Sequence, residues 1–124
     1  MLSIDDQKLA EDWIKYHLSQ NKNEECRHFS AWETLDKLVR EDPELAWVIM
    51  EEIRRLDSSD LILSSLAAGP LEDLLALHGR QFIERVETLA SQDPGFHRMA
   101  GGVWRNNIAD DIWRRLKKVA GPSF

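Results

Sequence analysis

Apolar residues recur at intervals of three and four positions along nearly the whole chain, which is the spacing of one face of an α-helix. The clearest stripes lie in residues 43–56 and 80–91. No stretch alternates apolar and polar residues over four or more positions with enrichment in β-branched residues, as a half-buried strand would. The pattern therefore predicts an all-α protein without a sheet.

Capping residues, prolines and glycines divide this pattern into about seven or eight short helices. Asp42-Pro43 and Asp93-Pro94 each place a capping side chain before a proline in the first turn of a helix. We expect Gly69-Pro70 and Gly79 to separate helices, and Gln20–Asn23 to form a polar loop. The expected helices cover about residues 5–19, 24–40, 43–56, 58–68, 70–78, 80–91, 94–100 and 108–119. Because the connections are short, neighbouring helices should run antiparallel.

The second half of the chain repeats the first at an offset of 51 residues. When 32–54 is placed over 83–105, Glu33 meets Glu84 and the two Asp-Pro pairs coincide, and the match continues to residues 62 and 113. Such a period predicts two stacked, HEAT-like three-helix repeats, 32–62 and 83–113. Gly101-Gly102 should end the middle helix of the second copy early. The alternative is a chance alignment of two helix–Asp-Pro–helix segments.

Tryptophan is the unusual component, with five residues in a chain of 124. Large aromatic side chains in a small helical protein usually anchor one helix on another. Phe29, Trp32, Leu35 and Val39 are expected to face inward from the helix at 24–40. Five indoles are nevertheless more than one core of this size comfortably holds, which also predicts a homodimer, since twofold pairing is the commonest way to cover such surface.

Length and charge indicate a single domain, 1–124, with an acidic surface. Residues 1–60 contain 15 acidic and 8 basic residues, whereas residues 61–124 contain 7 and 8, for a net charge of −6. This balance favours a basic partner protein and disfavours non-specific binding to nucleic acid. The single cysteine, Cys26, fits a cytoplasmic setting. The longest uninterrupted apolar stretch, Leu45–Met50, is too short for a membrane span, and the N-terminus has no signal-peptide pattern.

No motif in the chain specifies a reaction or a ligand. The sequence has no nucleotide-binding glycine pattern, no serine–histidine–acid order and no zinc-ligand spacing, so we expect neither an enzyme nor a cofactor nor a metal. Glu72 and Asp73 follow Gly69-Pro70, where a helix N-terminus could bind an anion. Their own negative charge would repel a phosphate, so we interpret both as first-turn capping residues.

Trp47 is the leading candidate for contact with a partner protein. At helical spacing it shares a stripe with Glu44 and Glu51, away from the apolar face of the same helix. Tryptophan is enriched among the residues that dominate binding energy in interfaces. The competing interpretation is that Trp47 packs beneath a neighbouring helix.

The last helix offers a different surface, because Arg114, Arg115, Lys117 and Lys118 cluster on it. A basic helix can lie along phosphates, and Trp113 could stack on a base. The competing interpretation is structural: cations stabilise a helix C-terminus and pair with acidic residues one turn away.

The run Leu66-Ala67-Ala68-Gly69-Pro70-Leu71-Glu72-Asp73-Leu74-Leu75, followed by residues 82–87 and 102–104, resembles an uncharacterised family of small bacterial helical domains of unknown function. The similarity covers about residues 30–116, and the Gly-Pro-Leu-Glu-Asp-Leu-Leu part is its most specific element. The resemblance implies a bacterial, all-helical protein and supplies no activity, so no catalytic residue is transferred from it.

These observations favour a non-enzymatic protein-interaction module that binds a basic partner through its acidic N-terminal half. An inhibitor or immunity protein is one form of this function, and an adaptor is another. The alternative function is association with nucleic acid through the basic C-terminal helix.

Overall fold

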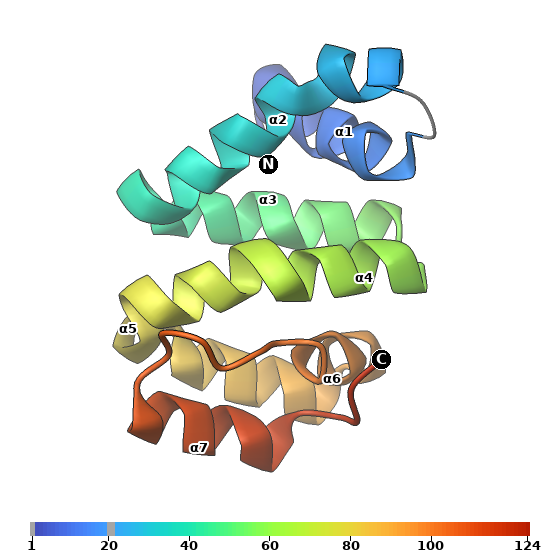
Figure 1. The fold of residues 1–124 in the computed structure, drawn as a ribbon. Helices are drawn as coiled ribbons and strands as arrows, with labels where there is room; N and C mark the ends of the chain where they lie inside the picture. Colours follow the sequence, from blue (N-terminus) through green and yellow to red (C-terminus); the bar gives the residue numbers. More distant parts are fainter. Residues whose placement is uncertain (1, 20–21) are drawn as a thin grey trace. The chain divides into compact units, whose positions relative to one another are not determined.

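The protein is all-α, as the sequence predicts (Figure 1). The structure is a computed structural model that describes residues 2–19 and 22–124, without the side chains of residues 22 and 24–26. The helices are α1 (Ile4–Leu18), α2 (Lys22–Glu41), α3 (Pro43–Leu56), α4 (Asp60–Leu66), a π-helical turn η1 (Ala67–Leu71), α5 (Glu72–Gln92), α6 (Pro94–Ala100) and α7 (Asp110–Val119). The described ranges contain no strand. Of the loop expected at Gln20–Asn23, the first two residues lie outside the described part, and α2 already includes the last two.

The chain forms two compact units, residues 1–62 and residues 63–124. The first unit holds α1, α2, α3 and the beginning of α4, and the second holds the remainder. Each unit is described below by itself. The expectation of a single domain over 1–124 stays a prediction.

In the first unit, α1 packs against α2 and α3. Ser3 begins α1 because its side chain accepts a hydrogen bond from the backbone N–H of Asp6 at 3.0 Å. Trp13 is 1% exposed and is the largest side chain of this core. The other buried residues of the three helices are Ala10, Ala31, Leu35, Val39, Ala46, Ile49, Met50 and Ile53.

Two residues expected in this core lie outside it. Phe29 is 41% exposed and Trp32 is 38% exposed, although Leu35 and Val39 of the same helix are buried as predicted. The buried stripe of α2 is narrow: it follows Ala31, Leu35 and Val39, at a strict spacing of four. Phe29 and Trp32 lie on the flank of that stripe, where no third layer of helices covers them within the unit.

In the second unit, α6 and α7 pack against α5. Phe96 of α6 and Leu116 of α7 are buried, as are several large side chains of α5. The buried residues of α5 are Leu74, Leu75, Gly79, Phe82, Ile83, Val86 and Ala90.

The expected helix break at Gly69-Pro70 is wrong, because the chain stays helical from Asp60 to Gln92. A proline inside an α-helix lacks an N–H to donate, and its ring collides with the carbonyl four residues earlier. The wider turn of a π-helix over Ala67–Leu71 accommodates Pro70, which is buried. The break expected at Gly79 is reduced to a kink: His78 has φ −134° and ψ 33°, and α5 continues beyond it.

The helical run from Asp60 to Gln92 spans 33 residues, and by length and composition it is apolar enough to cross a membrane. Polar residues occur among the apolar residues of this run. It therefore does not stand out in the sequence as an uninterrupted apolar stretch. Buried helices of soluble proteins pass the same test, and 44% of the apolar window is buried here.

The two Asp-Pro pairs occupy equivalent positions at the starts of α3 and α6. Asp42 accepts a hydrogen bond from Leu45 N–H at 3.3 Å, and Asp93 accepts from Gly95 and Phe96 N–H at 2.9 and 3.2 Å. In both helices the proline stands in the first turn. The shorter helix, α6, ends at Ala100, as the Gly101-Gly102 pair predicts. The stacked HEAT-like repeat itself stays a prediction.

Gly101 allows the C-terminal tail to lie directly on the end of α6. A Cβ atom at this position would be 2.4 Å from the carbonyl oxygens of both Gly121 and Pro122. The N–H of Gly121 donates to the carbonyl of His97 at 3.0 Å, so the tail covers a free carbonyl of the last turn of α6.

We predict that Gly101→Ala lowers the free energy of unfolding by roughly 1–3 kcal/mol, because backbone atoms must move to admit the methyl group. Gly69→Ala is the matched control, since a Cβ there meets nothing within 4 Å. The control should raise stability by about 0.5–1 kcal/mol, because alanine loses less entropy in a helix. Urea denaturation measures both, and equal stability of the two variants would contradict the prediction.

Candidate functional site

An exposed group of aromatic rings lies on α1 and α2 of the first unit. Phe29 and Trp32 stack with ring centroids 5.6 Å apart and planes 12° apart, and Tyr16 lies 5.9 Å from Phe29. Glu33 is exposed beside them, and Asp36 follows one turn later. We call these five residues the aromatic–acidic face.

Helical spacing produces this face. Phe29, Trp32, Glu33 and Asp36 stand at positions i, i+3, i+4 and i+7 of α2, which bring side chains to one side of a helix. Asp36 is also bonded to Arg40, with 2.5 Å between carboxylate Oδ2 and guanidinium Nη1. Glu33 therefore supplies an exposed carboxylate next to the stacked rings, whereas the charge of Asp36 is shared with Arg40.

The ring of His17 packs against the neighbouring rings of Trp13 and Tyr16. Its ring lies 4.0 Å from that of Trp13 and 5.0 Å from that of Tyr16, the latter edge-on. Burial lowers the pKa of His17, because desolvation disfavours the charged imidazolium. Its Nε2 atom is buried without a hydrogen-bond partner among the described residues. His17 is thus a neutral packing element at pH 7.

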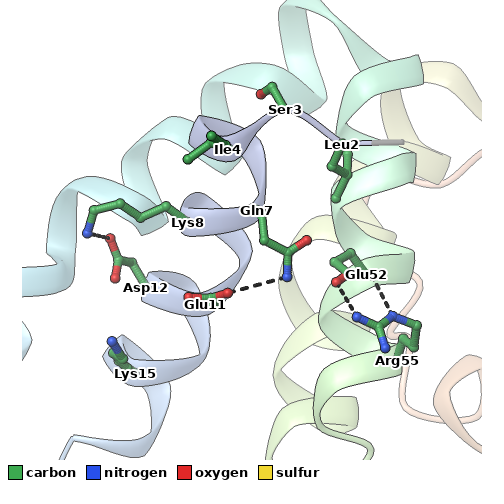
Figure 2. A pocket seen from close by; sticks show the side chains of 10 residues that line it. All are labelled: Leu2, Ser3, Ile4, Gln7, Lys8, Glu11, Asp12, Lys15, Glu52 and Arg55. Carbon is green, nitrogen blue, oxygen red and sulfur yellow. Dashed lines mark hydrogen bonds and ion pairs between the residues drawn. The ribbon is translucent and has the colours of Figure 1, made fainter.

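A groove of about 680 Å³ runs between α1 and α3 of the same unit (Figure 2). Four of its charged side chains form two pairs: Lys8 lies 3.2 Å from Asp12, and Arg55 donates twice to Glu52, each time at 2.7 Å. Figure 2 shows Gln7 of α1 donating to Glu11 of the same helix, across the groove from the Glu52–Arg55 pair of α3. The groove therefore combines apolar surface from Leu2 and Ile4 with charged groups that are partly paired.

The hydrogen bond from Arg55, with a smaller one from Gln7, lowers the pKa of Glu52 from 4.5 to about 2. Glu52 is consequently a carboxylate at every physiological pH and cannot act as a general acid, which needs a pKa near the working pH. Among the described residues, no three His, Cys, Asp or Glu side chains converge to hold a metal ion. Within this groove, Glu52 contributes an ion pair and not a general acid.

The three residues expected to contact a partner protein, Trp47, Glu44 and Glu51, are only partly available for binding. Trp47 is half-buried and Glu44 is exposed. Glu51 accepts two hydrogen bonds from Arg54, both at 2.9 Å, so its charge is largely compensated within α3. A partner-binding role for these three residues stays a prediction.

The basic residues of α7 separate into two groups. Arg115 donates to Glu87 of α5 at 2.9 and 2.5 Å, and this pair lowers the pKa of Glu87. Arg114, Lys117 and Lys118 are exposed. Lys117 nevertheless lies over the ring of Trp113, at 5.3 Å from its centroid. Arg115 therefore holds α7 on α5, and three cations remain for a ligand.

Glu72 has a role beyond capping. One of its oxygens accepts from the backbone N–H of Trp104 at 3.3 Å, and the other accepts from the side-chain amide of Asn106 at 2.7 Å. It thereby joins the start of α5 to the loop between α6 and α7. Asp73, the next residue in the first turn of α5, is half-buried.

Trp104, on that loop, is 71% exposed and was not singled out from the sequence. The 51-residue register places it over Ile53, which is fully buried. The signal that could have identified it is local: two glycines precede it and two asparagines follow it, which is a turn composition rather than a helical one.

The chain belongs to a family of unknown function, DUF6869, whose model matches residues 19–123. This membership agrees with the resemblance to an uncharacterised family of small helical domains. Searches of curated proteins and of solved structures return no match.

We predict that Glu52→Gln removes an acid-dependent part of the stability. Because the folded pKa of Glu52 lies below its unfolded value, its contribution is fully present above about pH 4.5 and is lost as the pH falls towards 2. Wild type should therefore exceed the variant in free energy of unfolding near neutral pH, and the difference should shrink over that window. Denaturation at several pH values measures it. Arg55→Gln should show the same loss, and a difference independent of pH would contradict the assignment.

Proposed function

We propose that the protein is a non-enzymatic protein-interaction module whose aromatic–acidic face binds a basic segment of a partner protein. An inhibitor or immunity protein for a basic toxin and an adaptor are two forms of this function. A bacterial, cytoplasmic setting is part of the proposal.

The observation that carries the proposal is the exposed stacked pair of Phe29 and Trp32. Phenylalanine and tryptophan bury about 150–250 Å² each when covered, so the two-fifths left exposed corresponds to roughly 2 kcal/mol per ring at about 25 cal/mol per Å². Water contact with both rings is therefore unfavourable in the free protein. A partner that covers them gains this free energy.

The charges of the first unit define the chemistry of that partner. Residues 1–62 carry a net charge of −7, which attracts basic surfaces. A guanidinium group can stack on the indole of Trp32 while it donates to the carboxylate of Glu33. Arginine fits both interactions better than lysine, because its planar fork stacks and donates at once.

We predict that a short oligo-arginine peptide binds the protein more tightly than an oligo-lysine peptide of the same length, as measured by calorimetry. Trp32→Ala should weaken arginine-peptide binding by at least about tenfold, the size expected for an interface anchor. Glu33→Gln should weaken it less.

Ile4→Ala is the matched control, because Ile4 is 87% exposed on α1 and stands outside the aromatic–acidic face. It should leave peptide binding unchanged. Unchanged binding by a folded Trp32→Ala variant would refute the proposed site.

Trp47, with Glu44 and Glu51, is an alternative partner-binding surface in the same unit. If it is used, Trp47→Ala combined with Glu44→Gln and Glu51→Gln should weaken peptide binding without lowering thermal stability. Unfolding of this triple variant would identify Trp47 as a core residue instead.

The second candidate function is association with nucleic acid through α7. The exposure of Arg114, Lys117 and Lys118 supports it, and the engagement of Arg115 with Glu87 limits it to three of the four cations first considered.

We predict for this function a mobility shift of single-stranded oligonucleotide at low salt that weakens steeply as salt rises. Replacing Arg114, Lys117 and Lys118 by Glu should abolish the shift. Arg80→Glu, which reverses an exposed cation of α5, is the control. Absence of any shift for the wild type at low salt would exclude this candidate.

A further inference from the structure

The loop between α6 and α7 holds Trp104 in a fixed position although the ring itself is exposed. Val103 and Ile108, on either side of residues 104–107, are buried and anchor both ends of this segment. The N–H of Ile108 donates to the carbonyl of Arg105 at 2.8 Å and closes a turn. Asn106 has a φ of 37°, in the left-handed region that asparagine tolerates better than most residues.

Glu72 completes this arrangement from outside the loop. Its two oxygens accept from the backbone of Trp104 and from the side chain of Asn106, so they fix the residue that carries the indole and the residue that turns the chain. A hydrogen-bonded loop loses little conformational entropy when it binds. Trp104 is therefore a preorganised anchor rather than part of a fluctuating segment.

A second exposed aromatic ring, Phe124, lies against Gly102, two residues before Trp104. Phe124, 48% exposed, covers Gly102, where a Cβ atom would lie 3.0 Å from its ring carbons. The guanidinium of Arg98 lies 5.0 Å from the centroid of the Phe124 ring. Arg105, next to Trp104, is exposed and forms an ion pair with Asp110. We call Arg98, Trp104, Arg105 and Phe124 the Trp104 surface.

We propose that the Trp104 surface binds the aromatic–acidic face of a second copy of this chain, so that the protein associates head to tail. The inference rests on the proposed function, because it names the second unit of another copy as one basic partner of that face. Both surfaces present aromatic rings. Arg98 places a cation on one surface, and Glu33 places a carboxylate on the other.

The charge distribution favours this pairing over a symmetric one. The first unit has a net charge of −7 and the second of +1. Two first units would repel each other, whereas a first unit and a second unit attract. A contact between unlike surfaces leaves one surface free on each copy, and it therefore continues into a chain or closes into a ring.

The test is sedimentation of the full-length protein over a wide range of concentration. The apparent mass of the wild type should rise above 14.4 kDa as its concentration rises. Trp32→Ala and Trp104→Ala should each weaken it at least about tenfold. Ile4→Ala and Leu77→Ala, which truncate exposed apolar side chains elsewhere in each unit, should not.

Mixing the two defective variants separates head-to-tail association from other geometries. Trp32→Ala retains an intact Trp104 surface and Trp104→Ala retains an intact aromatic–acidic face. An equimolar mixture should form a one-to-one complex that stops growing at twice 14.4 kDa. Glu72→Ala should weaken association with Trp104 still present, because the loop loses its two fixed bonds, and Glu72→Gln, which keeps one acceptor oxygen, should weaken it less.

A wild type that stays monomeric at all concentrations would overturn the inference. A dimer that is weakened by Trp104→Ala but not by Trp32→Ala would also overturn it, since that pattern indicates symmetric pairing. Oligo-arginine binding distinguishes these failures from failure of the proposed function. A monomer that still binds the peptide through Trp32 refutes self-association alone, and a Trp32→Ala variant that binds the peptide normally refutes the proposed face.

Discussion

The small size of each unit is the constraint on which the rest of the structure depends. With 62 residues and three or four helices, a unit can bury only one narrow stripe of each helix. On α2 that stripe is Ala31, Leu35 and Val39, whose small and aliphatic side chains permit close helix contacts. Bulky rings on the flank of the stripe have no further layer to cover them. The exposed Phe29–Trp32 pair is a consequence of this limit.

Polar contacts then decide which exposed groups are available to a ligand. Glu51–Arg54, Glu52–Arg55 and Glu87–Arg115 are bidentate pairs that use both partners locally. Surface pairs of this kind add little to stability, but they remove charge from the surface that a partner meets. Glu33 and Arg114, by contrast, are exposed without a bidentate partner in the described ranges. The candidate surfaces are consequently smaller than the clusters of charge in the sequence.

The sequence predicts local features well and tertiary ones poorly. The helix type and the caps at Asp42 and Asp93 follow from residues within one turn, and both are confirmed. The break expected at Gly69-Pro70 failed because a π-turn admits proline without ending the helix. The inward placement of Trp32 failed because stripe width is set by neighbouring helices. Trp104 was not identified because it lies between the expected helices, where helical spacing gives no indication of exposure. The partner-binding role of Trp47 and the repeat itself stay predictions.

The divergence between the two aligned segments is informative about function as well as fold. Where α3 continues through the buried Ile53, α6 has already ended, and the aligned residue is the exposed Trp104. Burial of Ile53 stabilises the first unit, whereas an indole in water contributes nothing comparable to the second. The second segment also keeps Asn106 in a left-handed conformation and engages Glu72 to hold the turn. The contacts of Glu72 hold the backbone of Trp104 and the side chain of Asn106, and they leave the indole ring exposed. The proposed self-association would cover this ring, and such exposed apolar surface is often found at binding sites.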